Sequence, residues 1–297
     1  MIKNISIIFS SIFLESLPFL LLGAIISSII ETFVSNETLA KIIPKNKVLG
    51  SIVGVLLGFF LPACDCAVIP VSKRLIRKKV PINVAVSFML ASPIINPVVL
   101  LSTYYAFYRS NPEIFWFRLI FGISISLVIG IIMGIIYNKK KILLDNEDEE
   151  INCCHDCDCH KHESNKFISI IKHTTNDLFE VLKFLMFGAL IASLIQVLMP
   201  RDILIMFNNN KVLSILVLML FAYLISLCST SDSFVGKSLL NSFPKSAIVG
   251  YLLLGPMIDI KNTIVLLGNY KKNFVLSLIF LIFITIFITS VLVVNLL

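Results

Sequence analysis

The chain has 297 residues, of which 57% are hydrophobic and 14% charged, and its mean hydropathy is +0.94. Soluble domains are about half apolar and about a quarter charged, so the composition excludes an ordinary cytosolic enzyme, a disordered chain and a nucleic-acid-binding protein. The net charge of +7 mostly reports orientation in a membrane, because Lys and Arg gather in cytoplasmic loops.

Long segments without Asp, Glu, Lys or Arg recur along the chain, and about 20 apolar residues suffice for a helix to cross a bilayer. We predict spans over residues 5–34, 48–70, 81–108, 115–137, 178–199, 212–230, 246–268 and 274–296. We interpret the first as a retained helix, because no clear signal-peptide cleavage site follows it. The sequence thus predicts an all-α polytopic membrane protein with eight spans, and ten spans are the alternative.

Three regions follow from this pattern: a first membrane region over residues 1–137, a charged loop over 138–172 and a second membrane region over 173–297. Alternation of the eight spans places the densest basic runs, within 73–79 and 139–141, on one side. The positive-inside rule makes that side the cytoplasm. We therefore expect a plasma-membrane protein with both termini and the charged loop in the cytoplasm.

The two membrane regions look like copies of one another. Residues 15–30 and 180–195 are identical at nine of sixteen positions. Polar and proline positions also align: Glu15 with Glu180, Cys64 with Cys228, Pro93 with Pro256, and Asn96 with Asp259. Duplicated halves are typical of secondary transporters, in which the substrate site lies between the repeats. We expect two repeated halves of about four helices each.

The first duplicated motif combines prolines, thiols and carboxylates. It contains Pro62, Cys64, Asp65, Cys66 and Pro70, and its counterpart contains Cys228, Ser229, Ser231 and Asp232. Each proline removes a backbone donor, and non-helical backbone at membrane depth persists only inside protein or beside a wet cavity. Symmetry between the halves would bring Cys228 near Cys64 and Cys66, and a thiol cluster suits a soft solute. The alternative is a pair of helix ends with cysteines as packing residues.

The second duplicated motif predicts two broken helices. Its members are Pro93, Asn96 and Pro97 in the first half, and Pro256, Asp259, Lys261 and Asn262 in the second. A broken helix exposes backbone groups that bind solutes or ions. The alternative is a structural kink with an Asp259–Lys261 ion pair.

Glu15 and Glu180 form a third pair, each eight residues before a glycine and thus on roughly the same helix face as that glycine. We predict a role in proton coupling. The alternative places Glu15 near one membrane surface, because only about ten apolar residues precede it.

The charged loop is rich in metal-binding side chains, namely Cys153, Cys154, His155, Cys157, Cys159, His160 and His162. This set exceeds the four ligands of a tetrahedral zinc site, and its overlapping spacings favour a flexible chelator of zinc, copper or another soft metal. The clustering favours thiols over disulfides, which suits a reducing cytosol. The alternative is a solvated acidic linker. We expect no required cofactor elsewhere.

These motifs resemble the predicted permease family of the ArsP type, over the whole chain except the charged loop. The resemblance rests on Pro62-x-Cys64-x-Cys66, on Ser92-Pro93-x-x-Asn96-Pro97 and above all on Gly255-Pro256-Met257-Ile258-Asp259-Ile260-Lys261-Asn262. It implies an integral-membrane permease, and the best-understood members export trivalent organoarsenicals such as methylarsenite. Asp65 departs from the family pattern, which has a small residue there, and an ionised Asp favours a cation or a proton over a neutral arsenical.

The sequence therefore predicts a secondary efflux permease for a soft metal or metalloid compound. The proton gradient is the expected driving force, because the chain has no P-loop. The alternatives are a membrane subunit or metal sensor of a larger transport system and an intramembrane enzyme. We expect no enzyme, because no apolar span contains a histidine that could serve as a base. The expected partners are the lipid bilayer, a small solute and either a second copy or a partner subunit.

Overall fold

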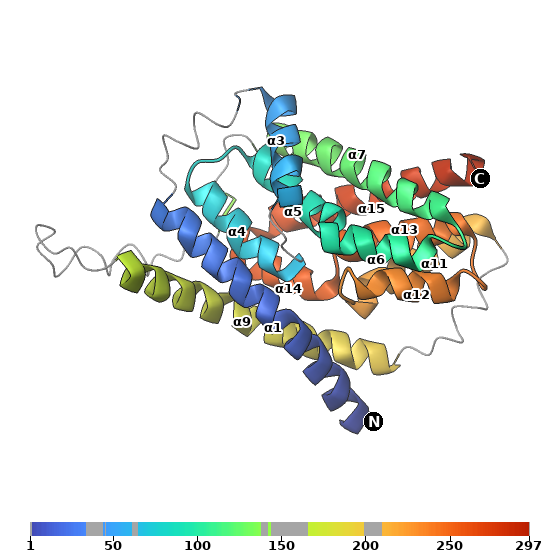
Figure 1. Cartoon of the computed structure of the whole chain (residues 1–297), viewed down its shortest axis with the longest axis horizontal. Helices are drawn as coiled ribbons and strands as arrows, with labels where there is room; N and C mark the ends of the chain where they lie inside the picture. Colours follow the sequence, from blue (N-terminus) through green and yellow to red (C-terminus); the bar gives the residue numbers. More distant parts are fainter. Residues whose placement is uncertain are drawn as a thin grey trace, which may run out of the picture.

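The computed structural model describes residues 2–33, 44, 46–60, 65–137, 142–143, 166–198 and 210–296, which are mostly helical (Figure 1). The helices of the first half are α1 (Ile2–Phe33), α3 (Lys47–Phe60), α4 (Asp65–Arg77), α5 (Ile82–Ile95), α6 (Pro97–Phe107) and α7 (Pro112–Ile136). Those of the second half are α9 (Lys166–Leu198), α11 (Lys211–Ile225), α12 (Ser231–Leu239), α13 (Lys245–Met257), α14 (Ile260–Asn269) and α15 (Lys272–Leu296).

Within the described ranges, six segments are long and apolar enough to cross a membrane: Lys3–Ile26, Ile82–Phe107, Pro112–Ile136, Val181–Leu198, Lys245–Asn269 and Lys272–Val294. The apolar helices α3 and α11 are shorter, with 14 and 15 residues. The all-helical, multi-pass class of the prediction is thus confirmed. The number of eight spans and the duplication remain predictions.

Both predicted broken helices are broken, but Pro93 and Pro256 do not lie at the breaks. Pro93 lies inside α5 and Pro256 lies inside α13. Because proline lacks an N–H, it weakens the last turn, and each helix ends within three residues of it. At the first break, Pro97 holds Asn96 in an extended conformation with ψ of 129°.

The segment around Pro70 differs from the prediction. Residues from Asp65 onward form α4, and Pro70 lies inside this helix, so Cys66 is on helical backbone. A proline inside a helix removes one hydrogen bond without necessarily ending the helix. The residues expected to interrupt the helix before it, including Pro62, lie outside the described part of the chain.

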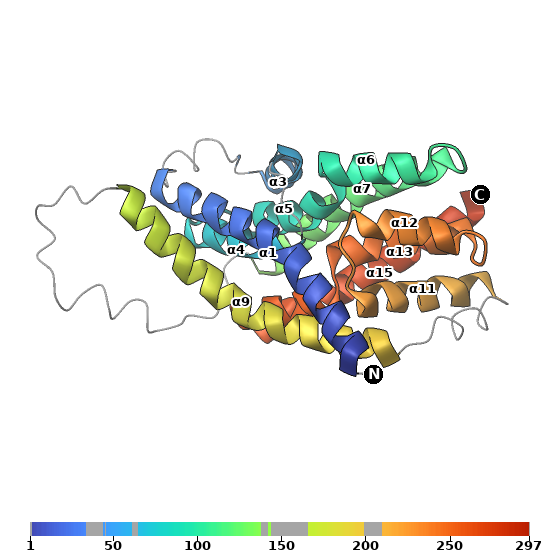
Figure 2. The same cartoon turned by 60° about the horizontal axis from the view of Figure 1, so that its bottom comes forward.

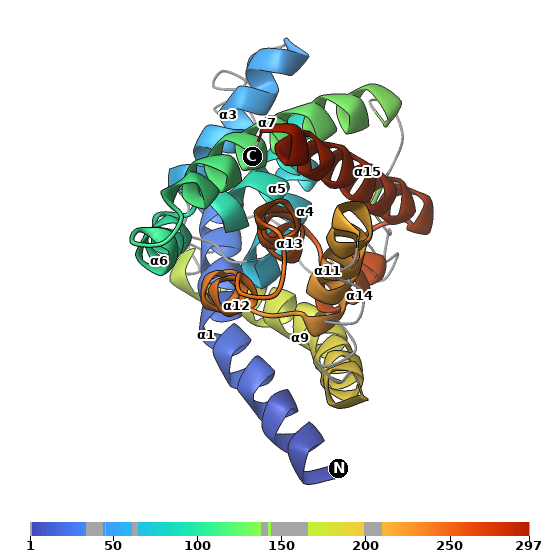
Figure 3. The ribbon, with the colours of Figure 1, turned by 90° about the vertical axis from the view of Figure 1, so that its right-hand side faces the viewer.

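The described helices follow the same order in the two halves: one long helix, one shorter apolar helix, one short helix, a broken pair and a final long helix. Helix α13 lies in the middle of the helical body, in contact with α5, α7, α11, α12 and α15 (Figure 3). Helices α1 and α9 pack along one another at one edge of this body (Figure 2). They also contact α4 and α14, respectively.

Glycines allow α5 to pack closely between α3 and α7. A Cβ atom at Gly54 of α3 would overlap the carbonyl oxygen of Val84, and one at Gly130 of α7 would overlap the hydroxyl of Ser87. Such small residues permit the close helix contacts on which membrane proteins depend, because lipid offers no hydrophobic driving force. The first broken helix is thereby fixed on two sides.

Candidate functional site

A cavity of about 220 Å³ lies where helices of both halves meet. Its polar lining comes from Ser11, Glu15 and Ser16 of α1, Cys66 of α4, Gln196 of α9, Ser226 and Cys228 of the segment after α11, and Lys261 of α14. Sites for drug-sized ligands usually have about 300–1,000 Å³, so this cavity suits a smaller solute. Four residues that the sequence singled out therefore line one cavity: Glu15, Cys66, Cys228 and Lys261.

The two thiols of the cavity come from the two motifs that the sequence aligned. Cys66 is on α4 in the first half and is 2% exposed. Cys228 is partly exposed and lies on the loop between α11 and α12, with its Sγ 3.4 Å from Oγ1 of Thr230. Cys66 and Cys228 thus line one cavity, and the predicted cluster with Cys64 remains a prediction because Cys64 lies outside the described residues.

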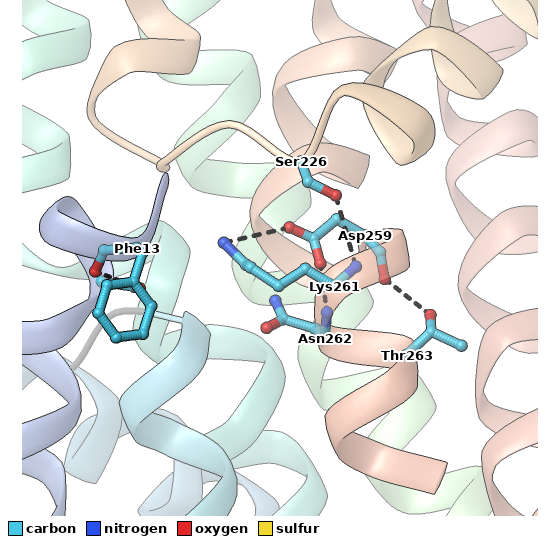
Figure 4. A network of polar contacts seen from close by, with 7 residues as sticks. Phe13, Ser226, Asp259, Lys261, Asn262 and Thr263 are labelled. Atoms are coloured by element: carbon cyan, nitrogen blue, oxygen red, sulfur yellow. Dashed lines mark hydrogen bonds and ion pairs between the residues drawn. The ribbon is translucent and has the colours of Figure 1, made fainter. Parts of the chain in front are cut away.

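Lys261 lines the cavity and forms an ion pair with the buried Asp259 (Figure 4). The Nζ atom of Lys261 lies 3.6 Å from Oδ2 of Asp259, and the two side chains are 5% and 0% exposed. Figure 4 shows the Lys261 side chain extending along Asp259 toward the side of the view on which Phe13 of α1 lies. The pair keeps two charges at membrane depth nearly neutral overall, as isolated charges there are costly.

Asp259 also begins helix α14. Its Oδ1 accepts a hydrogen bond of 2.6 Å from the backbone N–H of Asn262, and its carbonyl oxygen accepts the Oγ1 hydroxyl of Thr263 at 2.7 Å. An N-cap carboxylate satisfies a donor that the first turn of a helix leaves without a partner, and it is favoured by the helix dipole. The Asp259 carboxylate thus caps α14 just after the break and also forms the ion pair with Lys261.

The loop from Ser226 to Thr230 forms another wall of the cavity. Ser226 has a left-handed conformation, with φ of 51° and ψ of 49°, which is uncommon for a residue other than glycine. The Oγ atom of Ser226 accepts a hydrogen bond of 3.4 Å from the backbone N–H of Lys261. The loop is therefore tied to α14 at the point where it enters the cavity.

Glu15 connects α1 with the start of α12, because the hydroxyl of Ser231 lies 3.5 Å from its Oε1 atom. Its carboxylate lines the same cavity as the ammonium group of Lys261. Glu15 is exposed, in the lightly buried span Lys3–Ile26. The side chain of Glu180 lies outside what the structure describes, as does that of Asp65.

Part of the second motif lines a separate, smaller cavity of about 10 Å³. Pro93 and Pro256 both line it, together with Asn262. Asn96 is nearby in sequence and caps α6, where its Oδ1 accepts a hydrogen bond of 3.0 Å from the N–H of Val98. Asn96 and Asp259, which the sequence aligned, thus have the same local role at the two breaks.

A buried arginine that the sequence analysis did not single out forms a second polar cluster. Arg118 of α7 is 0% exposed. Its Nη1 donates to Oγ1 of Thr103 at 2.6 Å and to Oγ of Ser233 at 2.8 Å, and its Nη2 lies 3.4 Å from the carbonyl oxygen of Ser229. A charge inside the predicted span 115–137 was the signal that could have revealed it.

Asp232 belongs to this second cluster and does not line the larger cavity. Its Oδ1 accepts a hydrogen bond of 3.0 Å from the hydroxyl of Tyr251, and its charge interacts with that of Arg118. Arg118 and Asp232 belong to different halves of the chain, and both are almost completely buried. Among the predicted transport residues that the structure describes, Asp232 thus lies apart from Cys66, Cys228 and Lys261, which line the larger cavity.

Several predicted site residues lie outside the described part of the chain. These are Pro62, Cys64 and the loop residues Cys153, Cys154, His155, Cys157, Cys159, His160 and His162. Among the residues that the structure does describe, no three His, Cys, Asp or Glu side chains gather closely enough to hold a metal ion. Metal binding by the charged loop remains a prediction.

Known proteins share sequence similarity with most of this chain. A model of the predicted permease family ArsP_1 matches residues 1–295. The "Putative two-component membrane permease complex subunit" of Streptococcus mutans is 38% identical over 271 residues, which are 91% of this chain and 88% of that protein. The UPF0718 protein YcgR of Bacillus subtilis is 38% identical over 272 residues, which are 92% of this chain and 90% of that protein. No solved structure matches the chain.

The family match extends over the cavity, both helix breaks and the second polar cluster, and the relatives align with most of the chain. Together with the six apolar helices that can cross a membrane, it confirms the resemblance that the proline, cysteine and Asp259–Asn262 motifs indicated. This multi-pass membrane protein belongs to the predicted permease family ArsP_1.

Proposed function

We propose that this protein is a secondary efflux permease of the plasma membrane and that its solute is a small, soft metal or metalloid compound, such as a trivalent organoarsenical. The observation that carries this proposal is the cavity in which Cys66 and Cys228, from different halves, face one space with Glu15 and Lys261. Thiol sulfur is a ligand that soft metals and metalloids prefer. Membership of a permease family favours transport over an enzymatic reaction.

Reversible sulfur bonding would hold the solute while the two halves alternate between the two sides of the membrane. The thiols sit on different elements, Cys66 on α4 and Cys228 on the loop before α12. Relative movement of these elements would separate the thiols and release the solute. The ammonium group of Lys261 and the carboxylate of Glu15 give the cavity a site where protonation can change its charge.

A growth panel tests the proposal and identifies the solute. A metal-sensitive host expressing the protein is challenged with methylarsenite, arsenite, and mercury, copper and zinc salts. We expect resistance to one of them, which Cys66→Ser and Cys228→Ser abolish, whereas Cys153→Ser, which removes a thiol from the charged loop, leaves it intact. Unchanged resistance to every compound would refute soft-solute efflux.

The second candidate is a membrane subunit or metal sensor of a larger transport system. In this candidate the charged loop binds a metal ion and transmits the signal to a partner. The name of the Streptococcus mutans relative, which describes it as a complex subunit, favours this candidate. Removing residues 150–163 distinguishes the candidates. Lost transport at normal protein levels means that the loop is integral to transport, and unchanged transport means that it buffers or regulates.

A further inference from the structure

The loop that carries Cys228 is held by hydrogen bonds before and after this residue in the sequence. Before it, Ser226 accepts the backbone N–H of Lys261 at 3.4 Å. After it, the carbonyl oxygen of Ser229 faces Nη2 of Arg118 at 3.4 Å. The residue between these two attachments that lines the cavity with a thiol is Cys228.

Arg118 also fixes the helix that follows the loop. Its Nη1 donates to Ser233 of α12 at 2.8 Å, and the same Nη1 donates to Thr103 of α6 at 2.6 Å. The hydroxyls of Thr103 and Ser233 lie 3.0 Å from one another. One guanidinium group from the first half therefore joins α6, α7, the Cys228 loop and α12.

The loop needs such support because its backbone is strained. A non-glycine residue in the left-handed region, as Ser226 is, has a strained backbone that persists only where its surroundings determine it. The planar guanidinium suits this task, because its donors lie in a fixed fork, whereas the Lys ammonium is a flexible point charge. Asp232 supplies the opposite charge close by, which lowers the cost of burying Arg118 in a membrane helix.

We infer that Arg118 is the positioning residue of the Cys228 loop. It binds the loop through the carbonyl oxygen of Ser229, so that the Cys228 thiol faces the cavity that Lys261 also lines. Arg118 does not line the cavity itself. The inference rests on the proposed function only for the claim that this thiol binds the transported solute. The geometry of the loop can be tested without transport.

The test measures alkylation rates of two thiols that line the same cavity. Cys64, Cys153, Cys154, Cys157 and Cys159 are replaced by Ser, so that Cys66 and Cys228 remain in the protein. N-ethylmaleimide reacts with the protein in native membranes, and mass spectrometry follows each thiol separately. Cys66 on α4 is the matched control, because the described hydrogen bonds of Arg118 reach α6, α12 and the Cys228 loop and not α4.

In Arg118→Gln, loss of a charged hydrogen bond to Ser229 frees the loop, and we expect alkylation of Cys228 to accelerate about tenfold. The rate of Cys66 stays within about twofold, since only the loop is released. Arg118→Lys keeps the positive charge but loses the forked arrangement of guanidinium donors. We therefore expect Cys228 in this variant to be alkylated at a rate between those of the wild type and Arg118→Gln. The double variant Arg118→Gln/Asp232→Asn removes both buried charges. We expect it to fold even if Arg118→Gln alone does not, because no buried charge is left without its opposite.

The double variant also separates positioning from charge balance. If Arg118 served only to neutralise Asp232, the double variant would restore the wild-type rate at Cys228, and the inference would be overturned. Equal acceleration of Cys66 and Cys228, or no change at Cys228, would overturn it as well. A selective change at Cys228 combined with full transport by Cys228→Ser would refute the proposed function and leave the positioning role of Arg118 standing.

Discussion

The Nζ atom of Lys261 lies 3.6 Å from the Oδ2 atom of Asp259, with both side chains at most 5% exposed. The pair lies just after the break between α13 and α14, and Lys261 lines the larger cavity. Two opposite charges at this depth stabilise each other, whereas removal of one leaves the other buried without its ion-pair partner.

Lys261→Met should therefore lower the free energy of unfolding by about 3–5 kcal/mol. Asp259→Asn/Lys261→Met should recover most of this loss, because Asn removes the charge and still caps α14. The measurement is thermal unfolding in detergent, followed by circular dichroism. Lys245→Met is the control, since its ion pair with Glu113 is exposed and worth about 0–1 kcal/mol. A double variant no more stable than Lys261→Met contradicts the account.

Asn96 and Asp259 each cap the helix that follows a break, Asn96 through Val98 and Asp259 through Asn262. Replacing Asn96 by Ala should lower the free energy of unfolding by about 0.5–2 kcal/mol, and Asn96→Asp should cost less because Asp is an equally good cap. Chemical unfolding in detergent measures both. Equal losses for the two variants would show that the side-chain cap of Asn96 does not stabilise α6.

Gly54 controls the distance between α3 and α5. Ala is the better helix former by about 1 kcal/mol, yet a Cβ at Gly54 would overlap the carbonyl oxygen of Val84, and such overpacking costs about 1–3 kcal/mol or more. Gly54→Ala should therefore lower the unfolding temperature. Ile52→Ala, on the exposed side of the same helix, should change it little. An unfolding temperature raised by Gly54→Ala would contradict this packing.

Glu15 is the titratable carboxylate of α1 that lines the cavity. If it carries the coupled proton, Glu15→Gln should abolish transport driven by a pH gradient but retain exchange of labelled for unlabelled solute across vesicles, because exchange requires no net proton movement. Glu113→Gln, which alters an exposed ion pair, should leave both activities intact. Full response to the pH gradient in Glu15→Gln would exclude Glu15 as the proton carrier.

The sequence predicted the features that follow from local chemistry. Prolines beside small and polar residues predicted the two broken helices, and the alignment of Asn96 with Asp259 predicted that two polar side chains would occupy equivalent places. The ion pair between Asp259 and Lys261, which the sequence analysis gave as an alternative, joins opposite charges two residues apart. These features needed only neighbours in sequence or a comparison of the two halves.

The remaining features depend on contacts between distant parts of the chain. Arg118 meets Thr103 and Ser233 at sequence separations of 15 and 115 residues, which no local pattern contains. Pro70 was expected to interrupt a helix, but α4 continues through it because packing within the protein compensates for one lost donor. The inclusion of Ser226 and Gln196 in the cavity likewise arises from the way the helices pack.

The most direct test of the account measures transport of the solute selected by the growth panel into everted membrane vesicles. The account predicts that Cys66→Ser and Cys228→Ser each lower the initial rate about tenfold or more at equal protein levels, because each removes one of the two sulfur ligands. It predicts that Cys153→Ser transports at the wild-type rate. A Cys66→Ser/Cys228→Ser double variant that transports as fast as the wild type would contradict the claim that the solute passes through this cavity.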